Sequence, residues 1–338
     1  MSVDFWYRIK VRTTTQGLIS IRLKLQGEDK AVTGLEKEGL YLEKLVVITG
    51  TNASGKSGLG IELALNYGAE IVSADSRQIF TGLDLGSGKV TKEEMKGVAH
   101  HLIDVAQPND FYSLYEYQRD AYKAIDGIIT QGKIPFLVGG TGLYVNAVVD
   151  GYNLNTAKPN MELRKEVESK SKEELIEIIR NVSEEALKRL DLNNKQRLER
   201  AAEKALSGDL TEKPSKAIYE TLVLGVTWPR DVLYERIRER LDRRLDEGMI
   251  EEVENLRENG ATDDFLYRLG LEYRYILMYL RGEFDSFDAF YNKLFMEIRH
   301  LAKEQMTWFR KRKDIHWISM EDNPYEEAKK LIDDFLNS

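Results

Sequence analysis

A phosphate-binding loop is the sequence feature that most constrains this chain. Residues 46–57 read VVITGTNASGKS, and they match G-x-x-x-x-G-K-[ST] at every fixed position: Gly50, Gly55, Lys56 and Ser57. An apolar β-branched run precedes Gly50 and a helical pattern begins at Ser57. Backbone N–H groups, a lysine and a helix N-terminus are therefore expected to converge on phosphate oxygens. The loop predicts a phosphorylated ligand, with the Ser57 hydroxyl as a ligand of Mg²⁺.

Predicted strands and helices alternate around this loop. Strands are predicted at 45–49, 69–75, 133–142, 223–228 and 313–319, and helices at 57–68 and 113–132. This alternation predicts a P-loop NTPase-like α/β fold, a parallel sheet flanked by helices on both faces, with ligands bound at the carboxyl ends of the strands. Gly50, Asp75 and Thr141 each follow a different predicted strand, so they are expected at that edge of the sheet.

The pattern divides the chain into four parts. Residues 1–43 are an N-terminal extension without an assigned role, in which 18–26 alternate as a half-exposed strand would. Residues 44–154 and 222–320 form the predicted catalytic core with its helical C-terminal part. Residues 155–221 are charged and helical, which predicts an insertion domain. Residues 321–338 are expected to form a C-terminal helix.

Composition excludes several kinds of site. The 338 residues contain no cysteine and four histidines, which excludes disulfides, thiolate catalysis and cysteine-ligated zinc. No segment has the roughly 20 apolar residues that a membrane helix needs, and the N-terminus lacks the apolar core of a secretory signal. We therefore expect a cytoplasmic protein without membrane contact. The net charge of −8 argues mildly against nucleic acid, although local patches matter more than the sum.

Asp75 is the first candidate for chemistry. A carboxylate at a strand end beside a phosphate-binding loop could hold Mg²⁺ through water or act as a general base. A helix N-cap or turn former is the structural alternative. Ser76, Arg77 and Gln78 follow directly, and their side chains suit hydrogen bonding to a polar substrate such as a nucleobase.

A second glycine-rich turn reads FLVGGTGLY at 136–144. In many NTPases the strand beside the phosphate-binding loop ends in an acidic Mg²⁺ ligand, whereas this one ends in Gly139, Gly140 and Thr141. That difference argues against phosphoryl transfer, unless Asp75 takes the acidic role. The glycines would let the backbone approach a ligand; the alternative is a tight turn that needs positive φ.

Three basic segments have both a structural and a functional interpretation. Arg236, Arg240 and Arg243 or Arg244 share one helix face, which is either a salt-bridged exposed surface or a cationic wall over a pyrophosphate. The helix at 195–205 is either solvated or in contact with phosphates or bases. Residues 299–313 carry six Lys or Arg and one acid, which form either a solvated helix end or a nucleic-acid contact.

His100 and His101 precede a strand-like stretch. Adjacent side chains point to different faces, which makes a poor metal site, so these histidines are expected to serve packing and hydrogen bonding.

These motifs occur in one order with HHLIDV, KQRLER, VLYERIRERLD, GMIEEVENL, LGLEYR and LAKEQMTWFRKRKDIHW. In this combination, over residues 44–320, the chain resembles the tRNA isopentenyltransferase family, the bacterial tRNA dimethylallyltransferases. Thr51-Asn52 stand where the family usually has Pro-Thr, and Ser57 where it has Thr. The resemblance implies transfer of a dimethylallyl group from dimethylallyl diphosphate to N6 of the adenosine 3′ to the anticodon, with that adenine flipped into the protein.

The resemblance also implies residue roles. Asp75 is the implied base toward the adenine N6–H, Thr141 contacts tRNA and the reacting centre, and Arg240 contacts the diphosphate. The implied diphosphate-binding residues are Gly50, Thr51, Asn52, Ala53, Ser54, Gly55, Lys56 and Ser57, with Ser57 also the metal ligand. The implied tRNA-binding residues are Asp75, Ser76, Arg77, Gln78, Thr141, Arg164, Gln196, Arg197, Leu198, Glu199, Arg200, Arg268 and Arg274.

The expected partners are the anticodon stem-loop of tRNA, dimethylallyl diphosphate and Mg²⁺, with the protein a monomer. Two other functions stay open at this point: an adenylate isopentenyltransferase that acts on free AMP, ADP or ATP, and a P-loop small-molecule kinase. The helical insertion and the basic C-terminal part favour tRNA, because a free nucleotide requires neither.

Overall fold

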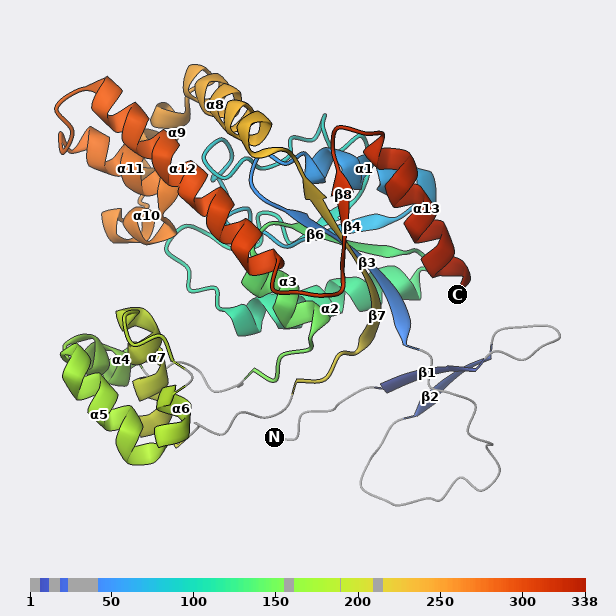
Figure 1. The fold of residues 1–338 in the computed structure, drawn as a ribbon, viewed down its shortest axis with the longest axis horizontal. Coiled ribbons are helices and arrows are strands. Elements are labelled where there is room, and N and C mark those ends of the chain that lie inside the picture. The colour runs from blue at the N-terminus through green and yellow to red at the C-terminus, as the bar shows by residue number, and fades with distance from the viewer. Residues whose placement is uncertain (1–6, 12–18, 24–41, 155–160, 189, 209–214) are drawn as a thin grey trace.

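A sheet of six parallel strands forms the centre of the protein (Figure 1). The computed structural model describes residues 7–11, 19–23, 42–154, 161–188, 190–208 and 215–338. The strand order is β5-β4-β6-β3-β7-β8, with β3 (Glu43–Gly50), β4 (Glu70–Ser73), β5 (His100–His101), β6 (Pro135–Gly139), β7 (Tyr219–Thr227) and β8 (Ile315–Ser319). Neighbouring strands are parallel throughout, which confirms the predicted α/β sheet. His100 and His101, predicted to precede a strand, are themselves the short β5.

Helices cover both faces of this sheet. Helices α1 (Lys56–Tyr67) and α13 (Pro324–Asn337) pack on one face, and α2 (Leu114–Thr130) and α3 (Gly142–Val149) lie on the opposite face (Figure 1). Because successive strand residues point to opposite faces, β3 contributes to both cores. Leu45 and Val47 pack toward α2 and α3, whereas Val46 and Ile48 pack toward α1 and α13.

A group of five helices follows β7 and lies beside the carboxyl ends of the strands (Figure 1). They are α8 (Arg230–Asp246), α9 (Met249–Glu258), α10 (Asp263–Leu269), α11 (Leu271–Leu280) and α12 (Phe287–Phe309). Helix α12, the longest of the five, contacts α8, α11, α3 and β3. It thereby connects the helical group to the strand that carries the phosphate-binding loop.

The insertion forms a small bundle with its own core, set apart from the sheet (Figure 1). Its helices are α4 (Met161–Glu168), α5 (Lys172–Val182), α6 (Glu184–Lys188) and α7 (Lys195–Leu206). Val167, Leu175, Ile179 and Leu198 are almost fully buried between these helices. A capping box between Ser171 and Glu174 begins α5, because each side chain accepts a hydrogen bond from the other residue's backbone N–H.

Before the core, β1 (Tyr7–Val11) and β2 (Ile19–Leu23) form an antiparallel pair that is separate from the main sheet. The strand predicted within 18–26 is therefore present as β2. The other residues of 1–41 lie outside the described part of the chain. Among the described helices, none combines the length and the apolar character needed to cross a bilayer.

Candidate active site

A cavity of about 700 Å³ lies at the carboxyl end of the sheet. Lys56, Asp75 and Thr141 line it together, although they follow three different strands. The strands concerned, β3, β4 and β6, are neighbours in the sheet, which brings their ends together. The structure thus joins the residues predicted from sequence around one space large enough for a small organic ligand.

The phosphate-binding loop runs from the end of β3 into the start of α1. Ala53 and Gly55 adopt positive φ of 56° and 87°, and Gly55 is the N-cap of α1. Residues Asn52 to Ser57 line the cavity, whereas Gly50 and Thr51 lie behind the loop. At Gly50, a Cβ would approach the Val226 carbonyl oxygen to 2.8 Å. Gly50 is thus required for packing against β7 and does not itself face the ligand space.

Two residues that follow β7, one directly after the strand and one on α8, bond to the loop. Trp228 Nε1 donates a hydrogen bond to the Ser54 carbonyl oxygen at 3.0 Å. Arg236 Nε donates to the Ala53 carbonyl oxygen at 3.0 Å, and its guanidinium lies 4.7 Å from the centre of the Trp228 ring. Two carbonyl groups of the loop are thereby bonded by residues that follow β7 in the chain.

Lys56 is the cation of the loop. Its Nζ donates to the Thr51 carbonyl oxygen at 3.2 Å. Burial lowers the pKa of Lys56 to about 8; nearby Asp75 opposes this decrease, while Arg240 and Arg244 add to it. A lysine that has lost hydration in this way gains stabilisation when an anion arrives beside it.

Gln305 of α12 is a site residue that the sequence analysis missed. Its Oε1 accepts from the Asn52 backbone N–H at 2.8 Å, and its Nε2 donates to the Gly140 carbonyl oxygen at 2.9 Å. The Asn52 side chain also donates to the Ile298 carbonyl oxygen at 3.3 Å. Helix α12 therefore connects the phosphate-binding loop to the second glycine turn. Gln305 lies within the recognised segment LAKEQMTWFRKRK, but nothing in its local sequence indicates this pairing.

Asp75 and Thr141 face the cavity from neighbouring turns. Asp75 Oδ1 accepts from the Arg77 backbone N–H at 3.0 Å, so one carboxylate oxygen orders the turn after β4. Thr141 Oγ1 accepts from the Ser76 backbone N–H at 3.0 Å and donates to Ser76 Oγ at 3.3 Å. Because each side chain is fixed through the same short segment, the carboxylate and the hydroxyl are held in a defined relation.

The glycines of the second turn allow neighbouring residues to approach the backbone closely. A Cβ on Gly139 would lie 2.2 Å from the Ala74 carbonyl oxygen, and one on Gly140 would lie 3.2 Å from Lys56 Nζ. Neither glycine is among the residues with positive φ, so the tight-turn interpretation is wrong. No carboxylate stands at the end of either strand beside β3, because β6 ends in Gly139 and β7 ends in Thr227.

Helix α8 contributes two arginines to the cavity wall. Arg240 and Arg244 line the cavity; Arg240 is half-buried, and only 8% of Arg244 is exposed. Burial and the neighbouring Arg244 lower the pKa of Arg240. Glu272 is the ion-pair partner of Arg244, at 3.8 Å. The interpretation of this helix face as a salt-bridged exposed surface is therefore wrong for these two residues, although Arg243 is exposed as that interpretation expects.

A second cavity of about 580 Å³ adjoins the first. Arg77 lines both cavities, and Arg274 and Trp308 line the second. Arg77 Nε donates to the Leu269 carbonyl oxygen at 3.1 Å, and Arg274 Nε donates to the Tyr267 carbonyl oxygen at 2.9 Å. Arg268, the other predicted contact in this region, is exposed and pairs with Asp264 at 3.0 Å. Gln78 is largely buried, lines the first cavity, and accepts a hydrogen bond from Ser73 Oγ at 3.2 Å.

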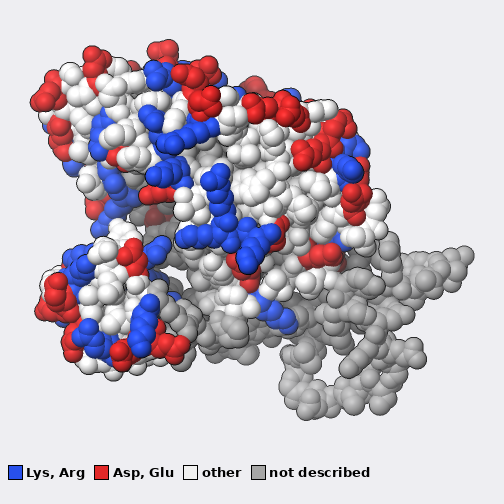
Figure 2. Space-filling view, viewed as in Figure 1, with Lys and Arg blue, Asp and Glu red and all other residues white. Residues whose placement is uncertain are grey.

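Basic side chains gather over the C-terminal end of α12, on the side that faces the insertion bundle (Figure 2). Arg310, Lys311 and Lys313 are exposed there. Arg312 is largely buried and pairs with Asp150 at 2.7 Å and Asp314 at 2.6 Å. The segment therefore contains both an exposed basic surface and one structural arginine.

The insertion presents some of its predicted contact residues and buries one. Gln196, Arg197 and Arg200 are exposed on α7, and Glu199 is half-buried and pairs with Lys195 at 3.4 Å. Leu198 is 0% exposed in the bundle core, so its side chain is not available to RNA and its assignment is corrected. Arg164 pairs with Glu203 at 3.1 Å, and its guanidinium lies 5.2 Å from the centre of the ring of Phe111, an exposed residue outside the insertion.

Comparison with known families decides the relationship. The model of the IPP transferase family matches residues 78–312, and that of isopentenyl transferases matches 43–108. The chain belongs to the IPP transferase family. Its members include tRNA dimethylallyltransferase 2 of Shewanella sediminis (strain HAW-EB3), which is 38% identical over 86% of this chain and 98% of its own length. A tRNA dimethylallyltransferase 1 of Geotalea daltonii is 40% identical over 86% and 95%.

Solved structures agree with this family assignment. The full-length tRNA isopentenylpyrophosphate transferase of Bacillus halodurans is 35% identical, covers 87% of this chain and 96% of its own, and gives a TM-score of 0.66. A eukaryotic dimethylallyltransferase acting on tRNA shares the fold at 21% identity, with a TM-score of 0.75. The IPP transferase fold therefore supplies the frame for the cavity described above.

Proposed function

We propose that this protein transfers a dimethylallyl group from dimethylallyl diphosphate to N6 of the adenosine 3′-adjacent to the anticodon in tRNA, releasing diphosphate. One observation carries this proposal. The Asp75 carboxylate and the cations Lys56, Arg240 and Arg244 line one cavity, while no carboxylate ends a strand next to the phosphate-binding loop. A carboxylate base next to a cationic site suits a reaction in which a carbon group is transferred and diphosphate leaves.

The cationic part of the cavity suits the leaving group. As the C–O bond of an allylic diphosphate breaks, negative charge grows on the diphosphate oxygens. Lys56, the N–H groups of the loop and the guanidinium of Arg240 can stabilise that charge as it forms, and such groups accelerate a reaction when they bind the transition state more strongly than the substrate. Arg244 lies beside Arg240 and adds to the positive potential.

Asp75 and Thr141 suit the acceptor. The exocyclic N6 of adenine is a weak nucleophile, so a carboxylate that accepts its proton while the C–N bond forms assists the reaction. The proton moves from N6 to Asp75, and the prenyl carbon moves from diphosphate oxygen to N6. The Thr141 hydroxyl, oriented by Ser76, can hydrogen-bond the same base.

The neighbouring cavity and the basic surface suit RNA. An adenine extruded from an anticodon loop must enter through the protein to reach Asp75. The second cavity adjoins the first at Arg77 and contains Arg274 and Trp308, a combination of cation and aromatic ring that suits phosphates and unstacked bases. The exposed cations of α12 and α7 extend this surface toward the backbone of the RNA.

Mg²⁺ is the metal ion we propose for the diphosphate. Among the described residues, no group of three or more acidic or histidine side chains could hold a metal ion. The chain offers the Ser57 hydroxyl at the start of α1, and Mg²⁺ commonly binds through few protein ligands together with phosphate oxygens and water. When bound, the ion would neutralise diphosphate charge beside Lys56.

A single assay tests the proposal against its alternatives. Purified protein is given labelled dimethylallyl diphosphate with Mg²⁺ and either unmodified tRNA or AMP, in the cytoplasmic pH range. We expect label on tRNA at the adenosine next to the anticodon, from a protein that sediments as a monomer. Label on AMP alone would indicate an adenylate isopentenyltransferase, and transfer of the γ-phosphate of ATP would indicate a kinase; either result contradicts the proposal.

A further inference from the structure

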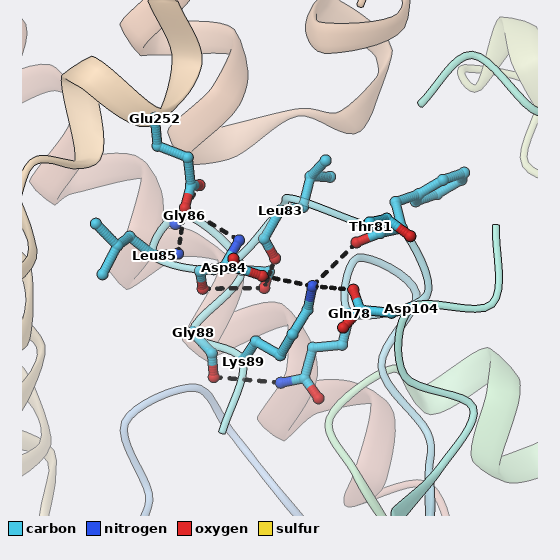
Figure 3. A network of polar contacts seen from close by, with 12 residues as sticks. Gln78, Thr81, Leu83, Asp84, Leu85, Gly86, Gly88, Lys89, Asp104 and Glu252 are labelled. Carbon is cyan, nitrogen blue, oxygen red and sulfur yellow. Dashed lines mark hydrogen bonds and ion pairs between the residues drawn. The ribbon is translucent and has the colours of Figure 1, made fainter. Parts of the chain in front are cut away.

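A carboxylate outside the predicted chemistry organises one wall of the diphosphate cavity. Glu252, on α9, accepts hydrogen bonds from three consecutive backbone N–H groups (Figure 3). It also accepts one from a phenol. The N–H donors are Asp84 at 3.0 Å, Leu85 at 2.6 Å and Gly86 at 3.0 Å, and the phenol is Tyr273 at 3.0 Å. Four donors on one carboxylate indicate a strong structural contact, because hydrogen bonds to a charged group are stronger than those between neutral groups.

The segment that Glu252 holds is the 84–88 turn, defined as residues Asp84–Gly88. Internal bonds close it, since Gly88 N donates to the Leu85 carbonyl oxygen at 3.1 Å and Lys89 N to the Asp84 carbonyl oxygen at 3.0 Å. Lys89 Nζ further pairs with Asp84 at 2.6 Å, and Gln78 Nε2 donates to the Gly88 carbonyl oxygen at 3.3 Å (Figure 3). The turn is therefore bonded on both of its flanks.

The far side of the 84–88 turn lies against the arginines of the cavity. At Gly88, which has a φ of +63°, a Cβ would lie 1.5 Å from Arg244 Nη2 and 1.9 Å from Arg240 Nη2. Residues Asp84 to Gly88 also line the cavity, together with residues of the phosphate-binding loop. The glycine backbone thus serves as the surface against which both guanidinium groups rest.

We propose that Glu252 is a positioning residue for the diphosphate site, acting through the 84–88 turn on Arg240 and Arg244. The proposal rests on the proposed function for the identity of the anion. Glu252 fixes the turn, the turn fixes where the two guanidinium groups can lie, and these then meet the diphosphate without prior rearrangement. Preorganised cations bind a developing anion better than mobile ones, because no ordering cost falls at the moment of reaction.

The first test is Glu252→Gln, with Glu251→Gln as the matched control on the same helix. Glu251 is exposed, so its variant should behave as wild type. Glu252→Gln places an amide N–H₂ among backbone donors and releases the turn. We expect pyrophosphate affinity to fall and KM for dimethylallyl diphosphate to rise by about tenfold, the ratio that corresponds to one lost charge-assisted contact. The dissociation constant for tRNA should not change.

The direction of the change separates positioning from simple electrostatics. Glu252 also contributes a negative charge near Arg244, so removing that charge alone would strengthen anion binding. Tighter or unchanged pyrophosphate binding by Glu252→Gln therefore overturns the proposal. Calorimetric binding of pyrophosphate needs no turnover, so this result stays distinct from a failure of the proposed function, in which wild type would not prenylate tRNA.

The second test leaves Glu252 intact and moves the arginines directly. Gly88→Ala adds a Cβ where the two guanidinium ends lie, and these flexible ends must shift. Gly68→Ala is the control, because Gly68 has a similar φ of +59° with nothing within 4 Å of its added Cβ. We expect Gly88→Ala to weaken pyrophosphate binding about tenfold, as for one lost charged contact, and Gly68→Ala to leave it unchanged. Equal effects of the two alanine substitutions would show that backbone strain alone weakens binding, and they would overturn the proposal. This test remains available if Glu252→Gln fails to fold.

Discussion

Gln305 Oε1 accepts a hydrogen bond from the Asn52 backbone N–H at 2.8 Å, so helix α12 contacts the phosphate-binding loop directly. The same amide group donates to the Gly140 carbonyl oxygen at 2.9 Å. One side chain therefore sets the spacing between the loop that would hold the diphosphate and the turn that carries Thr141. The geometry of the site depends on the docking of α12 as much as on the sheet.

Gln305→Ala tests this connection. Loss of two hydrogen bonds to half-buried backbone groups should lower the free energy of unfolding by about 1–2 kcal/mol, as measured by urea unfolding. The KM for dimethylallyl diphosphate should also rise, because the loop loses its support. Glu304→Ala, at the exposed neighbouring position, should leave the stability unchanged. Unchanged stability of Gln305→Ala would contradict the structural role.

Asp75→Asn tests the general base. The asparagine oxygen can still accept from the Arg77 backbone N–H, so the turn should persist while the proton acceptor is lost. We expect kcat to fall by a factor of about 10²–10⁴, the usual contribution of a general base. Binding of tRNA, measured separately, should be largely retained, and pyrophosphate should bind no more weakly, because the variant removes a negative charge near Lys56 and Arg240. A variant with normal kcat would remove Asp75 from the mechanism.

The pH dependence of diphosphate binding should report Lys56. Its pKa is lowered to about 8 in the free protein, and an anion binds the charged form better. The lysine is therefore mainly protonated at pH 7, and its contribution to the affinity is expected to be flat well below pH 8. Above that value binding requires uptake of a proton, so the affinity should decrease as pH rises.

Lys56→Arg supplies the control for this profile. A guanidinium at this position removes the lysine titration, so the profile of the variant contains the titration of the ligand and of the other cavity groups, such as Arg240. Subtracting that profile from the wild-type one isolates the contribution of Lys56. If the two profiles coincide between pH 7 and 10, the lowered pKa of Lys56 plays no part in binding.

Arg274→Gln tests the proposed RNA surface. The Arg274 guanidinium lies 4.6 Å from the centre of the Tyr267 ring and lines the second cavity. If it neutralises one phosphate, the variant should bind tRNA more weakly, with the slope of log K against log[salt] reduced by about 0.7–0.9. Pyrophosphate binding should not change. Lys329→Gln, on α13 and paired with Asp333, should leave both measurements as in wild type.

Local sequence patterns predicted the elements whose causes are local. The strand before Gly50, the helix ended by Gly68 and the helix over 113–132 all follow from apolar periodicity and capping. The burial of Leu198 could also have been read from sequence, because Leu198, Ala201, Ala202 and Ala205 form one apolar stripe on α7. Assignment of the whole segment 196–200 by resemblance ignored that periodicity.

By itself the sequence determined the phosphate-binding loop, the parallel sheet and the meeting of Asp75 with Thr141, because strand ends share one edge once the strands alternate with helices. Only the tertiary structure decided which charged groups complete the cavity. Arg244 and Glu252 have ordinary helical surroundings in the chain, and Gln305 lies far from Asn52 in sequence. Their roles arise when α8, α9 and α12 pack beside the sheet, since packing selects which face of each helix is buried and hence which side chains turn inward.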